Sequence, residues 1–131
     1  MVTTTIWKTG EDFESKFNKS RIEVSGNNGF SPKALLLSAL GACSGIDVVM
    51  ILEKMRVPFG DLKIDTEAEQ TDTDPKVFKD IRISYRIKTD EENRDKVIRA
   101  IKLSLEKYCG VAAMLKKHSR ISYELIIENI L

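Results

Sequence analysis

The chain has 131 residues, which suffice for one domain over residues 1–131 with a hydrophobic core that needs no metal or disulfide. Its 21 basic and 20 acidic residues leave a formal net charge of +1, which argues against nucleic acid and anionic membranes as partners. The first residues carry neither a basic segment nor an apolar run, so we expect no signal peptide and a cytoplasmic protein.

Short strands are predicted at the start of the chain. Alternating and β-branched residues indicate strands at 3–8, 12–17 and 21–26. The segment GNNGF, residues 26–30, ends this pattern. A helix is then expected to begin with Ser31 as its N-cap and Pro32 as its first residue.

This helix is expected to end near Met55, which gives it a length of about 37 Å at 1.5 Å per residue. Residues 35–52 are nearly all apolar or small, so hydropathy alone would also allow a membrane span. Asp47 lies in the middle of the stretch, where a charge in lipid is costly. We therefore predict a core helix and no membrane partner. Because the helix is apolar all round, it needs cover on more than one side, and a homodimer is the simplest source.

The second half of the chain continues with two alternating segments, 61–71 and 77–88, which predict a β-hairpin. Helical spacing then indicates a helix over 89–109 with Thr89 as its cap, and Gly110 ends it. A short helix over 111–118 and a strand over 120–130 follow. This order is typical of an α+β fold with mostly antiparallel strands.

The two cysteines, Cys43 and Cys109, lie 66 residues apart, without a CxxC motif or the spacing of a structural zinc site. They are either unrelated core thiols or one redox couple. Cys43 lies about 11 residues into its helix, too far from the N-terminus for the helix dipole to stabilise a thiolate. Cys109 precedes the short helix, so it is either a thiolate stabilised by that N-terminus or a buried thiol at a corner.

Asp47 lies one helical turn after Cys43, and an ionised carboxylate beside a thiol disfavours the thiolate. A buried aspartate needs a partner, either in a structural ion pair or in a functional contact. The single histidine, His118, is expected on the surface near a helix end. A thiol hydrolase or a metal site built on these residues is therefore not favoured, and no cofactor is expected.

Two segments together resemble the OsmC/Ohr superfamily over nearly the whole chain. The segment GFSPKALLLSALGACSGIDVVMILEKMRV, residues 29–57, resembles its central helix, with a small-residue run that ends in the first cysteine. The segment KYCGVAAMLKKHSRISYELII, residues 107–127, resembles its second-cysteine segment. The resemblance implies an OsmC-like α+β fold, with antiparallel sheets packed around long central helices in an intertwined homodimer.

The resemblance also implies a function, because the best-studied members reduce organic hydroperoxides as antioxidant proteins of the stress response. Cys43 would attack a small apolar hydroperoxide and become a sulfenic acid, which Cys109 would convert into a disulfide. An external dithiol would reduce that disulfide.

The sequence departs from the active members at one position and looks more like a divergent branch. In the active members, a glutamate follows the helix-starting proline and holds a catalytic arginine. Lys33 occupies this position here. Arg21 is the candidate for the arginine, and Lys33 lacks the planar fork of an arginine. The alternative function is a non-catalytic OsmC-like protein that binds a small ligand, with Cys43 and Asp47 as lining residues.

Overall fold

The computed structural model describes residues 1–129, which belong to two compact units, Met1–Leu37 and Ser38–Leu131. The observed order is three strands, a long helix, two strands, a series of helical segments and a last strand. This order confirms the predicted α+β class.

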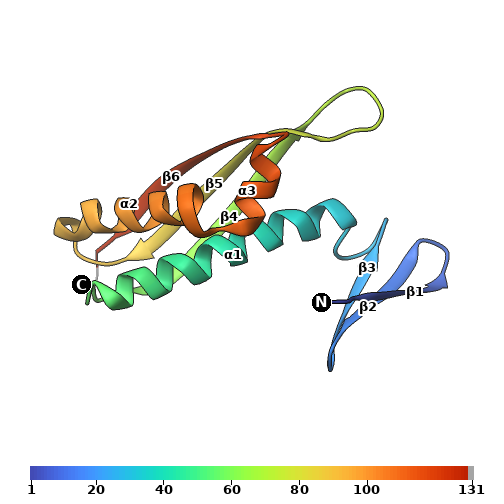
Figure 1. Cartoon of the computed structure of the whole chain (residues 1–131), viewed down its shortest axis with the longest axis horizontal. Coiled ribbons are helices and arrows are strands. Elements are labelled where there is room, and N and C mark those ends of the chain that lie inside the picture. Colours follow the sequence, from blue (N-terminus) through green and yellow to red (C-terminus); the bar gives the residue numbers. More distant parts are fainter. Residues whose placement is uncertain (130–131) are drawn as a thin grey trace. The chain divides into compact units, whose positions relative to one another are not determined.

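The first unit contains a three-stranded antiparallel sheet that confirms the predicted strands (Figure 1). Its order is β1-β2-β3, with bounds Thr4–Thr9, Asp12–Phe17 and Ser20–Ser25. The side chain of Ser25 organises the loop after β3, because its hydroxyl donates to Asp12 Oδ1 at 2.6 Å. The same oxygen accepts hydrogen bonds from the backbone N–H groups of Asn27 and Asn28 at 3.1 and 3.0 Å.

The long helix α1 (Pro32–Lys54) begins as predicted. Ser31 Oγ accepts a hydrogen bond from the backbone N–H of Ala34 at 3.2 Å, the geometry of an N-cap. The helix ends one residue before the predicted Met55, and Arg56 then adopts a positive φ of 57°.

The second unit contains the sheet β4-β5-β6, with bounds Gly60–Gln70, Phe78–Lys88 and Arg120–Glu128. β4 and β5 form the predicted antiparallel hairpin. β5 and β6 run parallel, unlike the rest, because the chain between them crosses back over the sheet through helices. The predicted end of the last strand at Ile130 lies outside the described residues.

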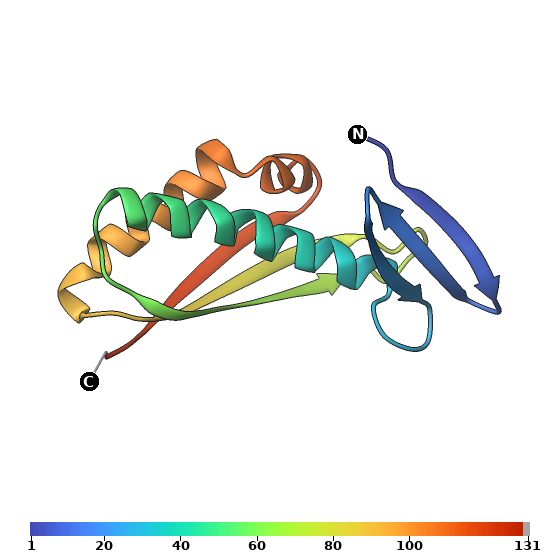
Figure 2. The ribbon, with the colours of Figure 1, turned by 90° about the horizontal axis from the view of Figure 1, so that it is seen from below.

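The helices α1 and α2 (Arg94–Leu103) lie on the same side of this sheet (Figures 1 and 2). Two glycines let α1 approach β4 closely. A Cβ atom on Gly41 would lie 3.0 Å from Thr66 Oγ1, and one on Gly45 would lie 3.0 Å from Ile64 Cδ1. The inward side chains of β5 are buried beneath the helices, namely Ile81, Ile83, Tyr85 and Ile87.

The predicted helix over 89–109 is present, but it begins at Glu91 and its two ends are not α-helical. A 3₁₀ turn (η1, Glu91–Asn93) precedes α2, and a π-helical turn (η2, Ser104–Tyr108) follows it. Thr89 does not cap a helix, because its hydroxyl donates to the carbonyl oxygen of Pro58 at 2.7 Å. The short helix α3 (Gly110–Lys116) then leads to β6.

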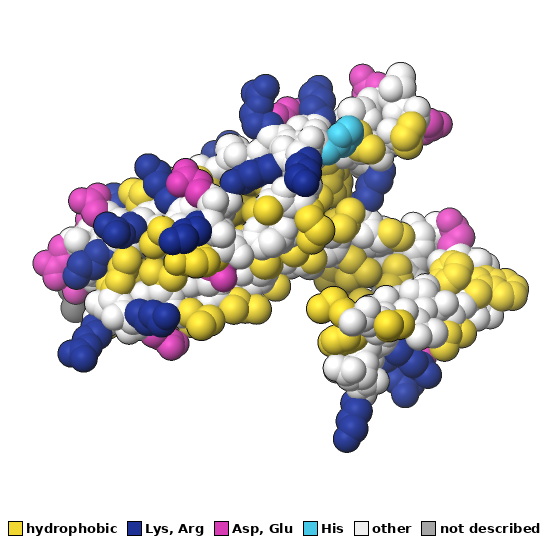
Figure 3. All heavy atoms as spheres, in the orientation of Figure 1, with side chains coloured by type: hydrophobic (Ala, Val, Ile, Leu, Met, Phe, Trp, Pro, Cys, Tyr) yellow, Lys and Arg dark blue, Asp and Glu magenta, His cyan; other side chains and the backbone are white. Residues whose placement is uncertain are grey.

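Hydrophobic side chains remain exposed in both units. Within residues 1–129, α1 is the helix with the length and hydropathy of a membrane span, and a third of that stretch is buried in protein. Ile46 and Met50 on α1 are 62% and 54% exposed, and Trp7 on β1 is 63% exposed. Figure 3 shows hydrophobic side chains gathered over α1 and α3.

Candidate functional site

The site is built around the two cysteines, which are both free thiols. Cys43 is half-buried on α1, and Cys109 is buried between η2 and α3. The Cys43 side chain lies close enough to Cys109 to raise the pKa of the Cys109 thiol. The fold of the second unit therefore brings together two sulfur atoms that are 66 residues apart in the sequence.

Cys109 is the N-cap of α3, and its sulfur accepts a hydrogen bond from the backbone N–H of Ala112 at 3.3 Å. Burial raises the pKa of the Cys109 thiol to about 11, and the hydrogen bond with Cys43 and the charge of Asp47 act in the same direction. The N–H of Ala112 opposes this shift and is outweighed. Of the two predicted states, the structure thus favours the buried thiol at a corner over the thiolate.

Asp47 faces the same region but does not form the ion pair that was one option for it. Among residues 1–129, its partner is the hydroxyl of Ser104, which donates to Asp47 Oδ2 at 2.9 Å. This hydrogen bond gives the half-buried carboxylate a polar partner.

The hydrogen bond to Asp47 is the end of a buried chain of hydroxyl groups. Ser104 Oγ lies 2.9 Å from Ser44 Oγ, which lies 2.6 Å from the hydroxyl oxygen of Tyr85. Each hydroxyl has a single proton, and a carboxylate only accepts. The Ser104 hydroxyl is the donor in both of its contacts, so its single proton serves either Ser44 Oγ or Asp47 Oδ2 at a given moment. Tyr85 can donate its own proton to Ser44. Burial raises the pKa of Tyr85 to about 12, so this residue is a neutral donor at physiological pH.

Sequence reasoning missed Ser44, Ser104 and Tyr85, which come from α1, η2 and β5. One signal was available for Tyr85, because it occupies the apolar side of an alternating strand and a buried tyrosine hydroxyl needs a partner. Ser44 and Ser104 have no comparable signal, since small residues are common on the packed faces of helices.

A cavity of about 320 Å³ is lined by Asp47, Met50, Ile51, Lys54 and Tyr108, and neither cysteine lines it. Asp47 lies one turn beyond Cys43 on α1, and Tyr108 directly precedes Cys109. The lining combines apolar side chains with one acidic and one basic group, which suits a small, largely apolar molecule.

The two candidate cations belong to the first unit. Arg21 on β3 is exposed and forms an ion pair with Glu14 at 3.6 Å. Lys33 is the second residue of α1 and is half-buried. His118 is exposed after α3, as predicted.

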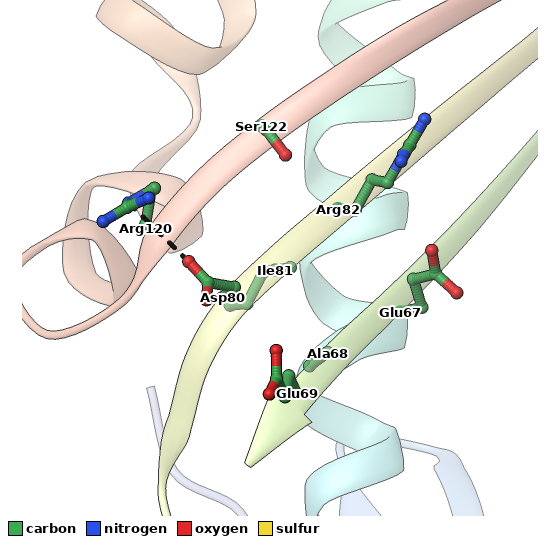
Figure 4. Close-up of a pocket in the computed structure, with 8 residues that line it drawn as sticks. All are labelled: Glu67, Ala68, Glu69, Asp80, Ile81, Arg82, Arg120 and Ser122. Atoms are coloured by element: carbon green, nitrogen blue, oxygen red, sulfur yellow. Dashed lines mark ion pairs between the residues drawn. The ribbon is translucent and has the colours of Figure 1, made fainter. Parts of the chain in front are cut away.

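A second depression lies on the outer face of β4, β5 and β6 (Figure 4). Its basic side chains are engaged by acidic neighbours: Arg120 pairs with Asp80 at 3.6 Å, and Arg82 pairs with Glu124 at 2.6 Å. It contains no cysteine or histidine, so we do not assign the chemistry to it. Over residues 1–129, no three His, Cys, Asp or Glu side chains are grouped to hold a metal ion.

Comparisons with known proteins give a consistent result. The family described as OsmC-like protein matches residues 25–124. Protein YhfA of Escherichia coli K12 is 38% identical over 104 residues, which cover 78% of each chain. A hypothetical protein from Aquifex aeolicus VF5 has a similar structure, with a TM-score of 0.84, 34% identity, and coverage of 97% of this chain and 96% of that one. The organic hydroperoxide resistance protein OhrB of Bacillus subtilis shares the fold, with a TM-score of 0.66, 15% identity, and coverage of 95% and 96%.

Proposed function

The chain belongs to the OsmC-like family, and from this premise we propose that it is a thiol-dependent peroxidase for small, apolar organic hydroperoxides. The observation that carries the proposal is the proximity of Cys43 to Cys109. The fold shared with organic hydroperoxide resistance proteins gives it further support.

The proposed reaction has two steps on the protein. The Cys43 thiolate attacks the distal peroxide oxygen, the O–O bond breaks, and the alkoxide takes a proton and leaves as an alcohol. Cys43 is then a sulfenic acid. The Cys109 sulfur displaces the sulfenic hydroxyl group, which leaves as water with the thiol proton, and a disulfide forms. An external dithiol reduces the disulfide by exchange and is itself oxidised to a disulfide.

A thiolate at Cys43 needs a positive charge, and Asp47 has the opposite sign. We propose Arg21 or Lys33 as the source of this charge. Arg21→Gln and Lys33→Gln each remove one cation. In the variant that lacks the cation which stabilises the thiolate, the hydroperoxide is expected to oxidise Cys43 more slowly. Lys19→Gln on the loop between β2 and β3 is the matched control.

We also propose that the protein is a cytoplasmic homodimer. The exposed Ile46 and Met50 of α1 and the exposed Trp7 of β1 support this assembly, because surfaces of this kind are costly in water.

Intact mass after exposure of the reduced protein to cumene hydroperoxide tests the function. The wild type is expected to lose two hydrogen atoms and Cys109→Ser to gain one oxygen atom, whereas Cys43→Ser is expected not to change. Turnover with dithiothreitol should disappear in Cys43→Ser.

An unchanged mass of the wild type would contradict the peroxidase. It would favour the alternative, a protein that binds a small ligand in the cavity beside Asp47. Oxidation of Cys109 in the Cys43→Ser variant at the wild-type rate would contradict the assigned order of the two cysteines.

A further inference from the structure

We propose that the hydrogen bond between Ser44 and Ser104 fixes the position of Cys43 relative to Cys109. Ser104 is thus a positioning residue for the formation of the Cys43–Cys109 disulfide. This inference rests on the proposed function and concerns its second step. It arises because each serine is fixed to one of the two cysteines and the serines are fixed to each other.

The first connection is covalent. Ser44 follows Cys43 directly on α1, and its side chain is fully buried. The position of the Ser44 hydroxyl therefore fixes the rotation of this turn of α1 and with it the direction of the Cys43 side chain.

The second connection is the π-helical turn. The backbone N–H of Cys109 donates to the carbonyl oxygen of Ser104 at 2.7 Å, a bond that reaches five residues back. Turns of this kind inside helices are frequent at functional sites. Here the turn ties the backbone of Cys109 to the residue whose hydroxyl reaches α1.

The third connection joins the two serines. Their Oγ atoms are 2.9 Å apart, and both side chains are fully buried. The same Ser104 hydroxyl also lies within donating distance of Asp47 Oδ2, at 2.9 Å. On the other side, the hydroxyl oxygen of Tyr85 on β5 lies 2.6 Å from Ser44 Oγ. Each hydroxyl of this chain therefore has a hydrogen-bond partner in the buried interior, which favours one packing of η2 against α1.

The equilibrium between the cysteine pair and glutathione tests the inference without peroxide. The ratio of disulfide to dithiol in buffers of reduced and oxidised glutathione reports how well the protein brings the two thiols together. Ser104→Ala removes the hydroxyl and holds the two thiols less closely in position, so we expect the equilibrium constant for the disulfide to fall about tenfold. This change corresponds to a potential about 30 mV less negative.

Two further variants serve as controls. Ser119 is also buried in the second unit, where its hydroxyl donates to the carbonyl oxygen of Phe78 at 2.6 Å. Ser119→Ala therefore loses a buried hydrogen bond elsewhere and should leave the equilibrium constant unchanged. Ser104→Thr keeps a hydroxyl group and should restore most of the wild-type value. If Ser104→Ala does not fold, Ser44→Ala removes the same hydrogen bond from the other side and takes its place.

The results separate this inference from the proposed function. A wild-type protein that forms no Cys43–Cys109 disulfide at any glutathione ratio would overturn both. A disulfide that forms equally well in the wild type, in Ser104→Ala and in Ser44→Ala would overturn the positioning role alone. A loss of equal size in Ser119→Ala would also overturn it, because the effect would then be one of general stability.

Discussion

The hydroxyl oxygen of Tyr85 lies 2.6 Å from Ser44 Oγ in the interior of the second unit, where both side chains are fully buried. This contact links the central strand of the sheet to α1 at the residue that follows Cys43. The hydrogen bond therefore connects the buried core of the second unit to the turn of α1 that carries the Cys43 thiol.

Tyr85→Phe is expected to lower the free energy of unfolding by about 1 kcal/mol, because one buried hydrogen bond is lost while Ser44 keeps its bond to Ser104. Urea denaturation followed by circular dichroism measures the loss. Tyr123→Phe is the matched control, since its ring packs edge-on against Tyr85 with centroids 6.4 Å apart. A loss in the control as large as in Tyr85→Phe would show that the hydroxyl of Tyr85 is not special.

Asp47→Asn is expected to lower the pKa of Cys109, because the negative charge of Asp47 is one of the causes that raise it. The pH dependence of Cys109 alkylation by iodoacetamide, measured in a Cys43→Ser background, reports this pKa. Asp65→Asn removes an equal charge from an exposed position of β4 and should leave the pKa unchanged. A pKa that does not move in Asp47→Asn would show that its charge does not act on Cys109.

The protein is expected to lose stability above pH 9. Cys109 has a folded pKa of about 11 against an ordinary value of 9.0, and Tyr85 has about 12 against 10.0. Both groups are neutral when protonated, so the raised values contribute stability fully below the ordinary pKa. That contribution is lost as the pH rises through the folded values.

Urea midpoints between pH 7 and 11 measure this loss. It should begin near pH 9 in the wild type and move toward pH 10 in Cys109→Ala, where the remaining loss comes from Tyr85. A midpoint that is constant up to pH 11 would contradict the prediction.

The close approach of α1 to β4 depends on two glycines. Valine at position 41 or 45 would place methyl groups beyond a Cβ that already lies 3.0 Å from Thr66 or Ile64. We expect Gly41→Val and Gly45→Val to lower the free energy of unfolding by about 1 to 3 kcal/mol through overpacking. Gly60→Val is the control, because no atom lies within 4 Å of its added Cβ. Stable Gly41→Val and Gly45→Val proteins would show that the helix can move away from the strand without cost.

The elements of the fold were predictable where the signal is local. Ser31 and Pro32 indicate the start of α1, and the alternation in β4 and β5 indicates their hairpin. The π-helical turn was not predictable, because Leu105 and Tyr108 continue the helical spacing of α2 and the change shows only in the backbone. The parallel pairing of β6 was missed for a related reason, since it depends on where the helices lead the chain.

The site was predictable only in part. The two cysteines stand out because they are the only cysteines in the sequence and neither belongs to a CxxC motif or to a zinc-site spacing. The need of Asp47 for a partner was also evident. Its actual partner, Ser104, is 57 residues away in the sequence. The residues on either side of Ser104 do not distinguish it from a serine on the surface. Long-range contacts of small polar residues are set by the packing of whole elements, which a single sequence does not reveal.

The exposed side of α1 leads to the last prediction, which concerns the proposed homodimer. Ile46→Asp places a charge where 62% of an isoleucine is exposed in the single chain. If a second copy covers this face, the buried charge has no partner and the dimer dissociates. Sedimentation velocity should then show a monomer for Ile46→Asp and a dimer for the wild type and for Ser122→Asp, which changes the exposed outer face of β6. A dimer that persists in Ile46→Asp would mean that this face of α1 stays in water, and its apolar residues would then need a different explanation.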